Sequence, residues 1–332
     1  MNLAPASGLP SARLDFDQDR VEAALRAVNG MLACDSRNVD ALMFVANCYK
    51  RLGDIPRARE ACLKALRIAP SRAETTSLLN CLPASGLALD HLDACPVCAS
   101  STSHKVFELA DCSFPLRLHQ CDGCEFVFMS PRLTPASIKE VEEDNSFYAY
   151  PPDVLRNEIS KRVELIRSFE RYKRPPGRMV DIGCNRGLLL EAARVAGWTP
   201  FGIDISDSAI QQIKRDFGLE AWCGSLDTFA PPQPFDLCVA WHVLEHTTAP
   251  GAFLANLHRL LAATGVLALQ VPCFSRLKEF STENRIYSLV NKVHNFHFTS
   301  ATLGRLVKGA GFQILQLVEG PDHMLTVFAT KP

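Results

Sequence analysis

The sequence predicts an α/β protein whose C-terminal half forms a doubly wound, mostly parallel sheet. From residue 178 onward, short apolar runs alternate with amphipathic helical stretches, as in RMVDIGC followed by LLLEAARVAG, and this alternation is typical of βαβ units. The last two runs, FQILQLVEG and HMLTVFATK, follow each other without a helix between them, so the sheet should end in an antiparallel strand. We therefore expect an all-α segment at 14–82, a small cysteine-rich segment at 91–130 and the α/β domain at 150–332.

Composition excludes several classes of protein. The 332 residues suffice for two or three domains, and the formal net charge of −1 argues against a nucleic-acid partner. No apolar run approaches the ~18 residues that span a bilayer, and the first 20 residues lack the pattern of a secretory signal. Thirteen cysteines, an odd number, suggest reduced thiols with some of them binding metal. We expect a cytoplasmic protein with no membrane partner.

The segment at 14–82 reads as helical repeats. Residues 38–70, NVDALMFVANCYKRLGDIPRAREACLKALRIAP, contain two amphipathic helices joined at LGD, and the spacing of their small and aromatic residues resembles a tetratricopeptide repeat. Ala24 matches Ala58 at the 34-residue interval, which suggests a degenerate preceding copy. Stacked repeats form grooves, so the segment could bind a protein partner or mediate self-association. A helical cap that shields the next domain is the alternative.

Two CxxC pairs, Cys95 with Cys98 and Cys121 with Cys124, lie 22 residues apart. Two such turns brought together by a hairpin place four thiolates at the corners of a tetrahedron, which suits zinc. Four thiolates leave no open position, so the zinc would be structural, and a segment this small needs the metal for its stability. The alternative is four free thiols.

A glycine-bounded turn follows the first strand of the α/β domain, in MVDIGCNRGLLLEAA at 179–193. Ligands of parallel sheets bind at the carboxyl ends of the strands. Gly183 and Gly187 permit positive φ and close approach of the backbone, and Asn185 tolerates the left-handed region. A phosphate-binding GxxxxGK[ST] loop is absent, and a dinucleotide GxGxxG would need glycine at 185 and 188. What remains is an acidic strand end before the turn, DxGxxxG.

DIGCNRG, then GIDIS, FDLCVAWHVLEH and a closing pair of strands, resembles the Rossmann-like sheet of class I S-adenosylmethionine-dependent methyltransferases. With the preceding zinc ribbon, residues 91–332 resemble the branch that includes sugar C-methyltransferases, and HVLEH is shared with the ubiquinone-biosynthesis type. The resemblance implies that S-adenosyl-L-methionine is the cofactor and that Asp204 accepts hydrogen bonds from its ribose hydroxyls. Asn185 and Arg186 depart from the family pattern and bear on affinity. The implied cofactor-binding residues are Asp181, Gly183, Gly187, Asp204, Ile205, Ser225 and Leu226.

Histidines supply the candidate catalytic groups. WHVLEHTTAP at 241–250 offers His242 and His246 as bases, although either could simply fix the turn. Their spacing with Glu245 also suggests a metal site, for which the motif lacks a third, distant ligand. The segment at 272–303 adds His294 and His297, and His297 matches a histidine that precedes FTxxTL in related sequences. Fixing the loop is its alternative role.

These expectations converge on methyl transfer from S-adenosylmethionine to a small-molecule acceptor, at oxygen or carbon, such as a sugar or another biosynthetic intermediate. One alternative is a methyltransferase that acts on RNA or protein, bound through the ribbon and the repeats. Another is a scaffold that no longer binds cofactor, and loss of cofactor binding would separate it from the other two.

Overall fold

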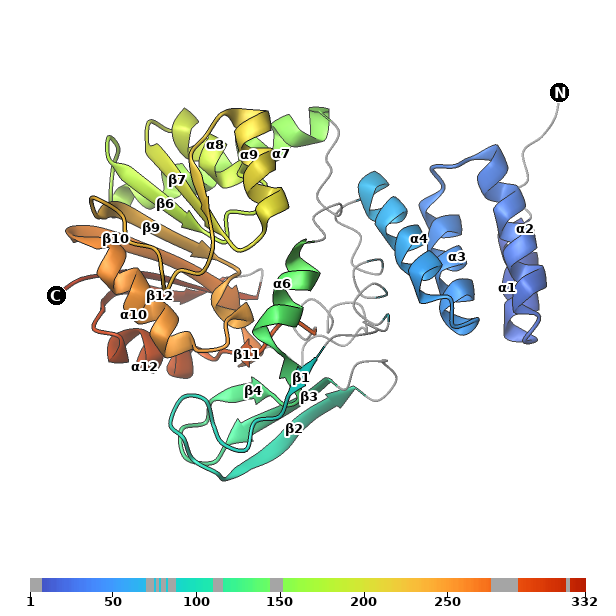
Figure 1. Ribbon diagram of the computed structural model, residues 1–332, viewed down its shortest axis with the longest axis horizontal. Coiled ribbons are helices and arrows are strands. Elements are labelled where there is room, and N and C mark those ends of the chain that lie inside the picture. Colours follow the sequence, from blue (N-terminus) through green and yellow to red (C-terminus); the bar gives the residue numbers. More distant parts are fainter. Residues whose placement is uncertain are drawn as a thin grey trace.

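A computed structural model describes residues 8–69, 88–109, 116–143, 152–275, 292–320 and 323–332, with single positions at 75, 78 and 82. Helices, a small sheet and an α/β domain follow one another along the chain (Figure 1). Most of the 73–82 stretch and the middle of the 272–303 segment lie outside the described residues. In the part of the chain that is described, no helix has the length and apolarity to cross a bilayer.

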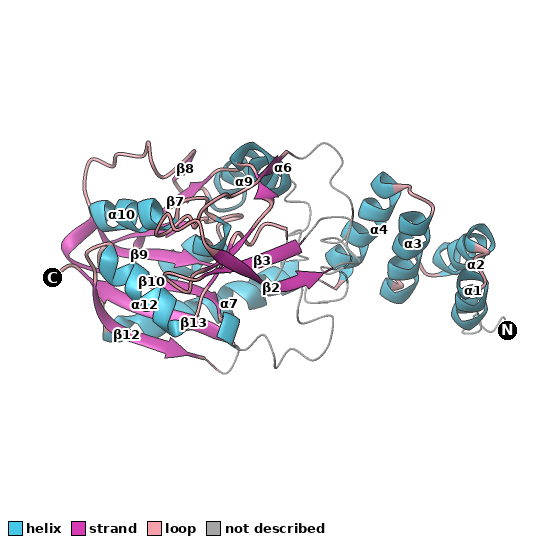
Figure 2. Cartoon of the chain, turned by 90° about the horizontal axis from the view of Figure 1, so that it is seen from below, coloured by secondary structure: helices cyan, strands magenta, loops and turns pink. Residues whose placement is uncertain are grey.

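The N-terminal part is helical, as predicted. Its helices are α1 (Gly8–Asp17), α2 (Val21–Cys34), α3 (Val39–Arg51) and α4 (Ile55–Ile68). The side chains of Asn38 and Asp54 cap α3 and α4 by accepting the backbone N–H groups of Ala41 and Arg57. Small buried residues such as Ala58 let the helices pack closely. Figure 2 shows the four helices side by side at one end of the molecule. Their membership of the tetratricopeptide family stays a prediction.

The α/β domain contains a seven-stranded sheet in the order β12-β13-β10-β9-β6-β7-β8. Strands β10, β9, β6, β7 and β8 run parallel, and β13 is antiparallel to both of its neighbours. The predicted doubly wound sheet with a terminal antiparallel strand is therefore confirmed. The strands are β6 (Arg178–Ile182), β7 (Thr199–Asp204), β8 (Ala221–Cys223), β9 (Phe235–Trp241), β10 (Leu261–Pro272), β12 (Gln313–Glu319) and β13 (Met324–Thr330).

Helices cover both faces of this sheet (Figure 1). On one face lie α7 (Pro152–Ser168), extended by the 3-10 turn η2 (Phe169–Arg171), with α8 (Leu188–Val195) and α9 (Asp207–Phe217). On the other lie α10 (Pro250–Leu260) and α12 (Ser300–Gly309). Successive residues of a strand point to opposite faces, so Met179 packs under the first group of helices and Val180 under the second.

The cysteine-rich part forms a four-stranded antiparallel sheet in the order β11-β4-β3-β2. Strands β2 (Ser103–Leu109), β3 (Leu116–Cys121) and β4 (Val127–Met129) belong to the ribbon, whereas β11 (Phe296–His297) comes from the α/β domain. Beside this sheet, β1 (Leu89–Asp90) pairs with β5 (Arg132–Leu133), and α6 (Pro135–Glu143) leads onward. The ring of Phe126 packs on those of Phe296 and Phe298, so the ribbon and the α/β domain share one apolar core.

Candidate active site

A cleft of about 1180 Å³ opens where β6, β7, β8 and β9 end. All the predicted cofactor-binding residues line it except Gly187. Of the predicted catalytic residues, His242 and His246 line it and His297 does not. Glu245 and His294 also reach the wall, so one cleft joins the glycine turn to the HVLEH segment.

The turn after β6 needs its glycines for both conformation and packing. Gly183 and Gly187 have φ of 69° and 77°, and Asn185 takes the left-handed region at 45°, as expected. A Cβ on Gly183 would lie 2.6 Å from Cγ2 of Val243, and one on Gly187 would lie 2.8 Å from Cγ1 of Ile213. The close approach at both glycines is therefore to protein side chains.

Asp204, at the end of β7, is held by two backbone groups. Its Oδ2 accepts the N–H of Asn185 at 2.7 Å, and its Oδ1 accepts the N–H of Ser206 at 2.9 Å. Each carboxylate oxygen has a second lone pair, so the side chain can still accept hydroxyl groups from a ligand in the cleft. Asn185, although it departs from the family pattern, therefore still links the turn to Asp204 through its backbone N–H.

Asp181 lies beneath this turn and is 4% exposed. Burial, reinforced by the nearby Asp204, raises the pKa of its carboxyl well above the usual range, and Arg162 opposes that shift. Asp181 therefore favours its neutral form more than an exposed aspartate does.

The HVLEH segment forms the opposite wall. His242, with φ of 56°, begins the turn, and Glu245 and His246 lie in the short 3-10 helix η3 (Leu244–His246). His242 Nδ1 is 3.4 Å from Glu245 Oε1, and the rings of His246 and His294 meet edge to face at 4.8 Å between centroids. The fold thus brings together histidines that lie some 50 residues apart in the chain.

Burial and charge set the ionisation of this cluster. Burial alone would raise the pKa of Glu245, but His242, His246 and His294 outweigh it and lower the pKa to about 2. Burial, together with His294, lowers the pKa of His246 to about 3. At neutral pH a buried carboxylate therefore stands beside an uncharged imidazole.

His297 lies behind the wall, on β11, and is 2% exposed. Burial, followed by the influence of His294, lowers the pKa of its imidazole to about 3, and its side chain hydrogen-bonds the backbone of His294. This position suits support of His294. A catalytic role for His297 stays a prediction.

Comparison with known proteins identifies this part of the chain. Residues 155–317 match the family model described as "Methyltransferase domain". This segment is a methyltransferase domain.

Curated relatives and solved structures were found for the methyltransferase domain. The chain is 33% identical over 113 residues to the ubiquinone biosynthesis O-methyltransferase of Rhodopseudomonas palustris (strain HaA2), and 32% to that of Bradyrhizobium sp. (strain ORS 278). Each match covers 31% of this chain and 45% of the relative, so the chain spans less than half the length of these relatives.

Two solved structures align with part of the chain. An S-adenosylmethionine-dependent methyltransferase from Clostridium acetobutylicum ATCC 824 has a TM-score of 0.42 and 12% identity, over 53% of this chain and 91% of that one. The glycopeptide N-methyltransferase MtfA has a TM-score of 0.43 and 15% identity, over 55% of this chain and 99% of that one.

The cleft of the methyltransferase domain also has walls that sequence reasoning missed. Arg162 on α7 and Arg59 on α4 line it, although the sequence shows both only as polar positions of amphipathic helices. Asp227 lies two residues after Ser225 and accepts its hydroxyl at 3.0 Å, and the Asn256 amide at 2.6 Å. An acidic residue after a short third strand was a signal that could have identified Asp227.

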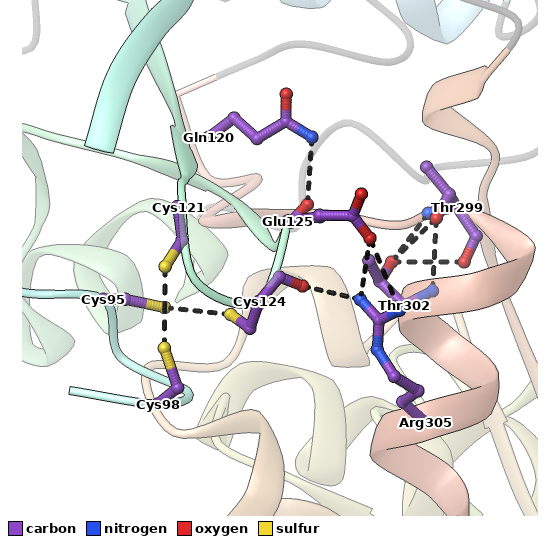
Figure 3. Close-up of polar contacts among 9 residues, drawn as sticks. All are labelled: Cys95, Cys98, Gln120, Cys121, Cys124, Glu125, Thr299, Thr302 and Arg305. Atoms are coloured by element: carbon purple, nitrogen blue, oxygen red, sulfur yellow. Dashed lines mark hydrogen bonds and ion pairs between the residues drawn. The ribbon is translucent and has the colours of Figure 1, made fainter. Parts of the chain in front are cut away.

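The four ribbon cysteines meet as the sequence predicts (Figure 3). Sγ of Cys95 lies 3.6 Å from that of Cys124, and Sγ of Cys98 lies 3.5 Å from that of Cys121. Zn–S bonds of about 2.3 Å give tetrahedral S–S edges of about 3.8 Å, so the donor set fits zinc. Burial opposes ionisation of Cys121, but N–H groups of Cys124 and Gly123 lower the pKa of its thiol to about 7.

The second cysteine turn is fastened to α12 of the methyltransferase domain (Figure 3). Arg305 Nη2 donates to the carbonyl of Cys124 at 2.6 Å and lies 3.4 Å from the Glu125 carboxylate. Thr299 and Thr302 form the capping box that begins this helix. The helix after β11 and the cysteine turn are therefore held together by a side chain as well as by the shared core.

Proposed function

We propose that the chain transfers the methyl group of S-adenosylmethionine to a small-molecule acceptor, at oxygen or at an acidic carbon. The observation that carries this proposal is the shared cleft, with the glycine turn and Asp204 on one wall and the Glu–His cluster on the other. Methyl transfer needs both partners held in line with water excluded, and a cleft of about 1180 Å³ has room for cofactor and acceptor together.

The cofactor half follows from the residues around the turn. Asp204 accepts the ribose hydroxyls, and Ile205 and Leu226 flank the adenine. Ser225 and Asp227 add polar contacts beside the adenine. Gly183 and Gly187 set the turn, while Asp181 orders the loop from below. Arg162 supplies a positive charge for the methionyl carboxylate of the cofactor.

The acceptor half centres on the histidines. His242 lines the cleft with its side chain 39% exposed and is oriented by Glu245, so it is placed to take the acceptor proton as the methyl group leaves the sulfonium. His246 and His294 line the acceptor half of the cleft beside it, and His297 positions His294. The named activity of the curated relatives, O-methylation, supports oxygen as the methylated atom.

The other parts have supporting roles in this proposal. The ribbon binds structural zinc, supported by its four converging sulfurs. The helical repeats bind a protein partner or a second copy of the chain. The neutral net charge gives no support to RNA as the acceptor.

Calorimetric titration of the zinc-loaded protein with S-adenosylhomocysteine tests the proposal. Wild-type protein should bind in the micromolar range, and Asp204→Ala should bind about 10- to 100-fold more weakly, because it loses charge-assisted hydrogen bonds to the ribose. Asp207→Ala is the matched control, since Asp207 is exposed, three residues away and absent from the cleft wall. A folded wild-type protein that does not bind, or an Asp204→Ala variant that binds equally well, rejects the proposal.

A further inference from the structure

Three potential ligands converge in the acceptor half of the cleft. One donor atom each from Glu245, His246 and His294 lie within 4.8 Å of one another. Glu245 is 1% exposed, and its carboxylate oxygens accept no hydrogen bond of good geometry from the described residues, although His242 Nδ1 lies 3.4 Å from Oε1. The HxxEH motif alone lacked a distant third ligand, and the fold supplies it in His294.

This convergence is built into the fold. Asn295, fully buried, donates from Nδ2 to the carbonyls of His246 at 2.9 Å and Thr247 at 3.0 Å. The backbone carbonyl of Asn295 accepts the N–H of Met129 in the ribbon at 2.9 Å. The residue next to His294 therefore clamps the two ligand-bearing segments against each other.

The chemistry of the three donors selects the ligand. A buried carboxylate without hydrogen bonds is costly unless a positive charge lies beside it. Two imidazoles and one carboxylate are a donor set that divalent first-row ions accept, with positions left open for other ligands. All three residues line the cleft, so those positions face the acceptor.

We propose that Glu245, His246 and His294 bind one divalent first-row cation in the acceptor half of the cleft. The purpose of this site rests on the proposed methyl transfer: the cation contacts the acceptor oxygen and makes its hydroxyl more acidic. His242 remains outside the ligand set and receives the proton. Three ligands with open positions distinguish this site from the closed four-thiolate site of the ribbon.

Manganese is the probe, because thiolates bind it poorly and the ribbon should keep its zinc. The full-length protein is titrated with Mn²⁺, and the free ion is followed by electron paramagnetic resonance. One Mn²⁺ should bind per chain. Glu245→Gln and His294→Asn should each weaken binding by at least about 10-fold, since even loss of an outer-shell partner costs 10- to 100-fold. His104→Asn, which removes an exposed histidine paired with Asp122, should bind as the wild type does.

Circular dichroism and S-adenosylhomocysteine titration of the same samples separate the outcomes. Absence of Mn²⁺ binding by folded wild-type protein overturns the metal site, as does equal binding by both cleft variants. If S-adenosylhomocysteine still binds in those cases, the methyltransferase proposal survives without the metal. Mn²⁺ binding that the cleft variants lose supports the site, even where the S-adenosylhomocysteine titration fails.

Discussion

The ribbon (91–130) and the N-terminal helices α1–α4, the predicted helical repeat, both precede the methyltransferase domain, yet they are attached to it in different ways. Cys121, Phe126 and Phe128 of the ribbon belong to the same apolar core as β6, β9 and β10. The described core of the repeat contains only residues between 9 and 82. A unit that shares a core with its neighbour should lose stability together with it, whereas a unit with a separate core can unfold separately.

The repeat nevertheless reaches the cleft. Arg59 and Leu63 of α4 are part of its wall, so the repeat contributes surface to the cleft without contributing to the domain's core. We therefore expect changes in the ribbon to affect stability and activity together. Changes inside the repeat should affect its own stability first.

Removing the zinc that we propose for the ribbon should have the largest effect. Cys95→Ser with Cys98→Ser eliminates half of the thiolates, and zinc binding by small structural sites is worth about 10–16 kcal/mol. Because the core is shared, the methyltransferase transition itself should shift down by several degrees in scanning calorimetry. Cys34→Ser, which changes an exposed thiol of α2, should leave the temperature of this transition unchanged. A methyltransferase transition unaffected by zinc loss would contradict the shared core.

A matched pair of core truncations sharpens the comparison. Phe126→Ala and Val28→Ala each empty a buried site and should cost about 3–5 and about 2 kcal/mol, respectively. Phe126→Ala should destabilise the methyltransferase domain and Val28→Ala, in the helical core, only the helical part, as separate transitions in calorimetry. If both variants lost S-adenosylhomocysteine binding equally, the ribbon and the helical repeat would be coupled to the methyltransferase domain to the same degree, against this expectation.

Asn295→Ala tests the clamp between the ribbon and the active site. It leaves two partly buried carbonyls without their donor and should cost about 1–3 kcal/mol of stability. Turnover and Mn²⁺ affinity should fall because His294 loosens, while S-adenosylhomocysteine affinity should hold. Unchanged turnover and Mn²⁺ affinity would mean that the shared core alone positions His294.

Arg305→Ala should have the smallest effect. Its ion pair with Glu125 is exposed, and such pairs contribute about 0–1 kcal/mol. Thermal unfolding of this variant should stay close to that of Lys308→Ala, on the same helix. A loss comparable to that of Phe126→Ala would show that the side chain, and not the core, fastens the ribbon.

The sequence could place the predicted cofactor-binding residues near one another because they are close in the chain, and all of them except Gly187 line the cleft. Their binding of the cofactor stays a prediction. DIGCNRG and the end of β7 follow strong strand patterns, and parallel strands end at a common edge, so Gly183 and Asp204 could be placed together. The four cysteines carried their own spacing signal. In each case the residues that form the site are close together in the sequence.

The remainder depended on long-range pairing. A two-residue strand such as β11 has no period that a sequence pattern can show, so the ribbon's fourth strand was not foreseen. The meeting of His294 with Glu245 follows from that pairing and from Asn295. The positions of Arg162 and Arg59 in the cleft wall could not be predicted, because a polar helix position has the same sequence pattern whether it faces water or a cleft.

Pairing of β4 with β11 has a consequence for the order in which the protein is made. Phe128 and its partner Phe296 are separated by nearly the whole methyltransferase domain, so the ribbon emerges from the ribosome long before its last strand exists. Until then one edge of β4 has unsatisfied backbone groups, the kind of edge that recruits other chains. The sheet and the active site are therefore completed in the same late step, whether or not the proposed zinc has already ordered the cysteine turns.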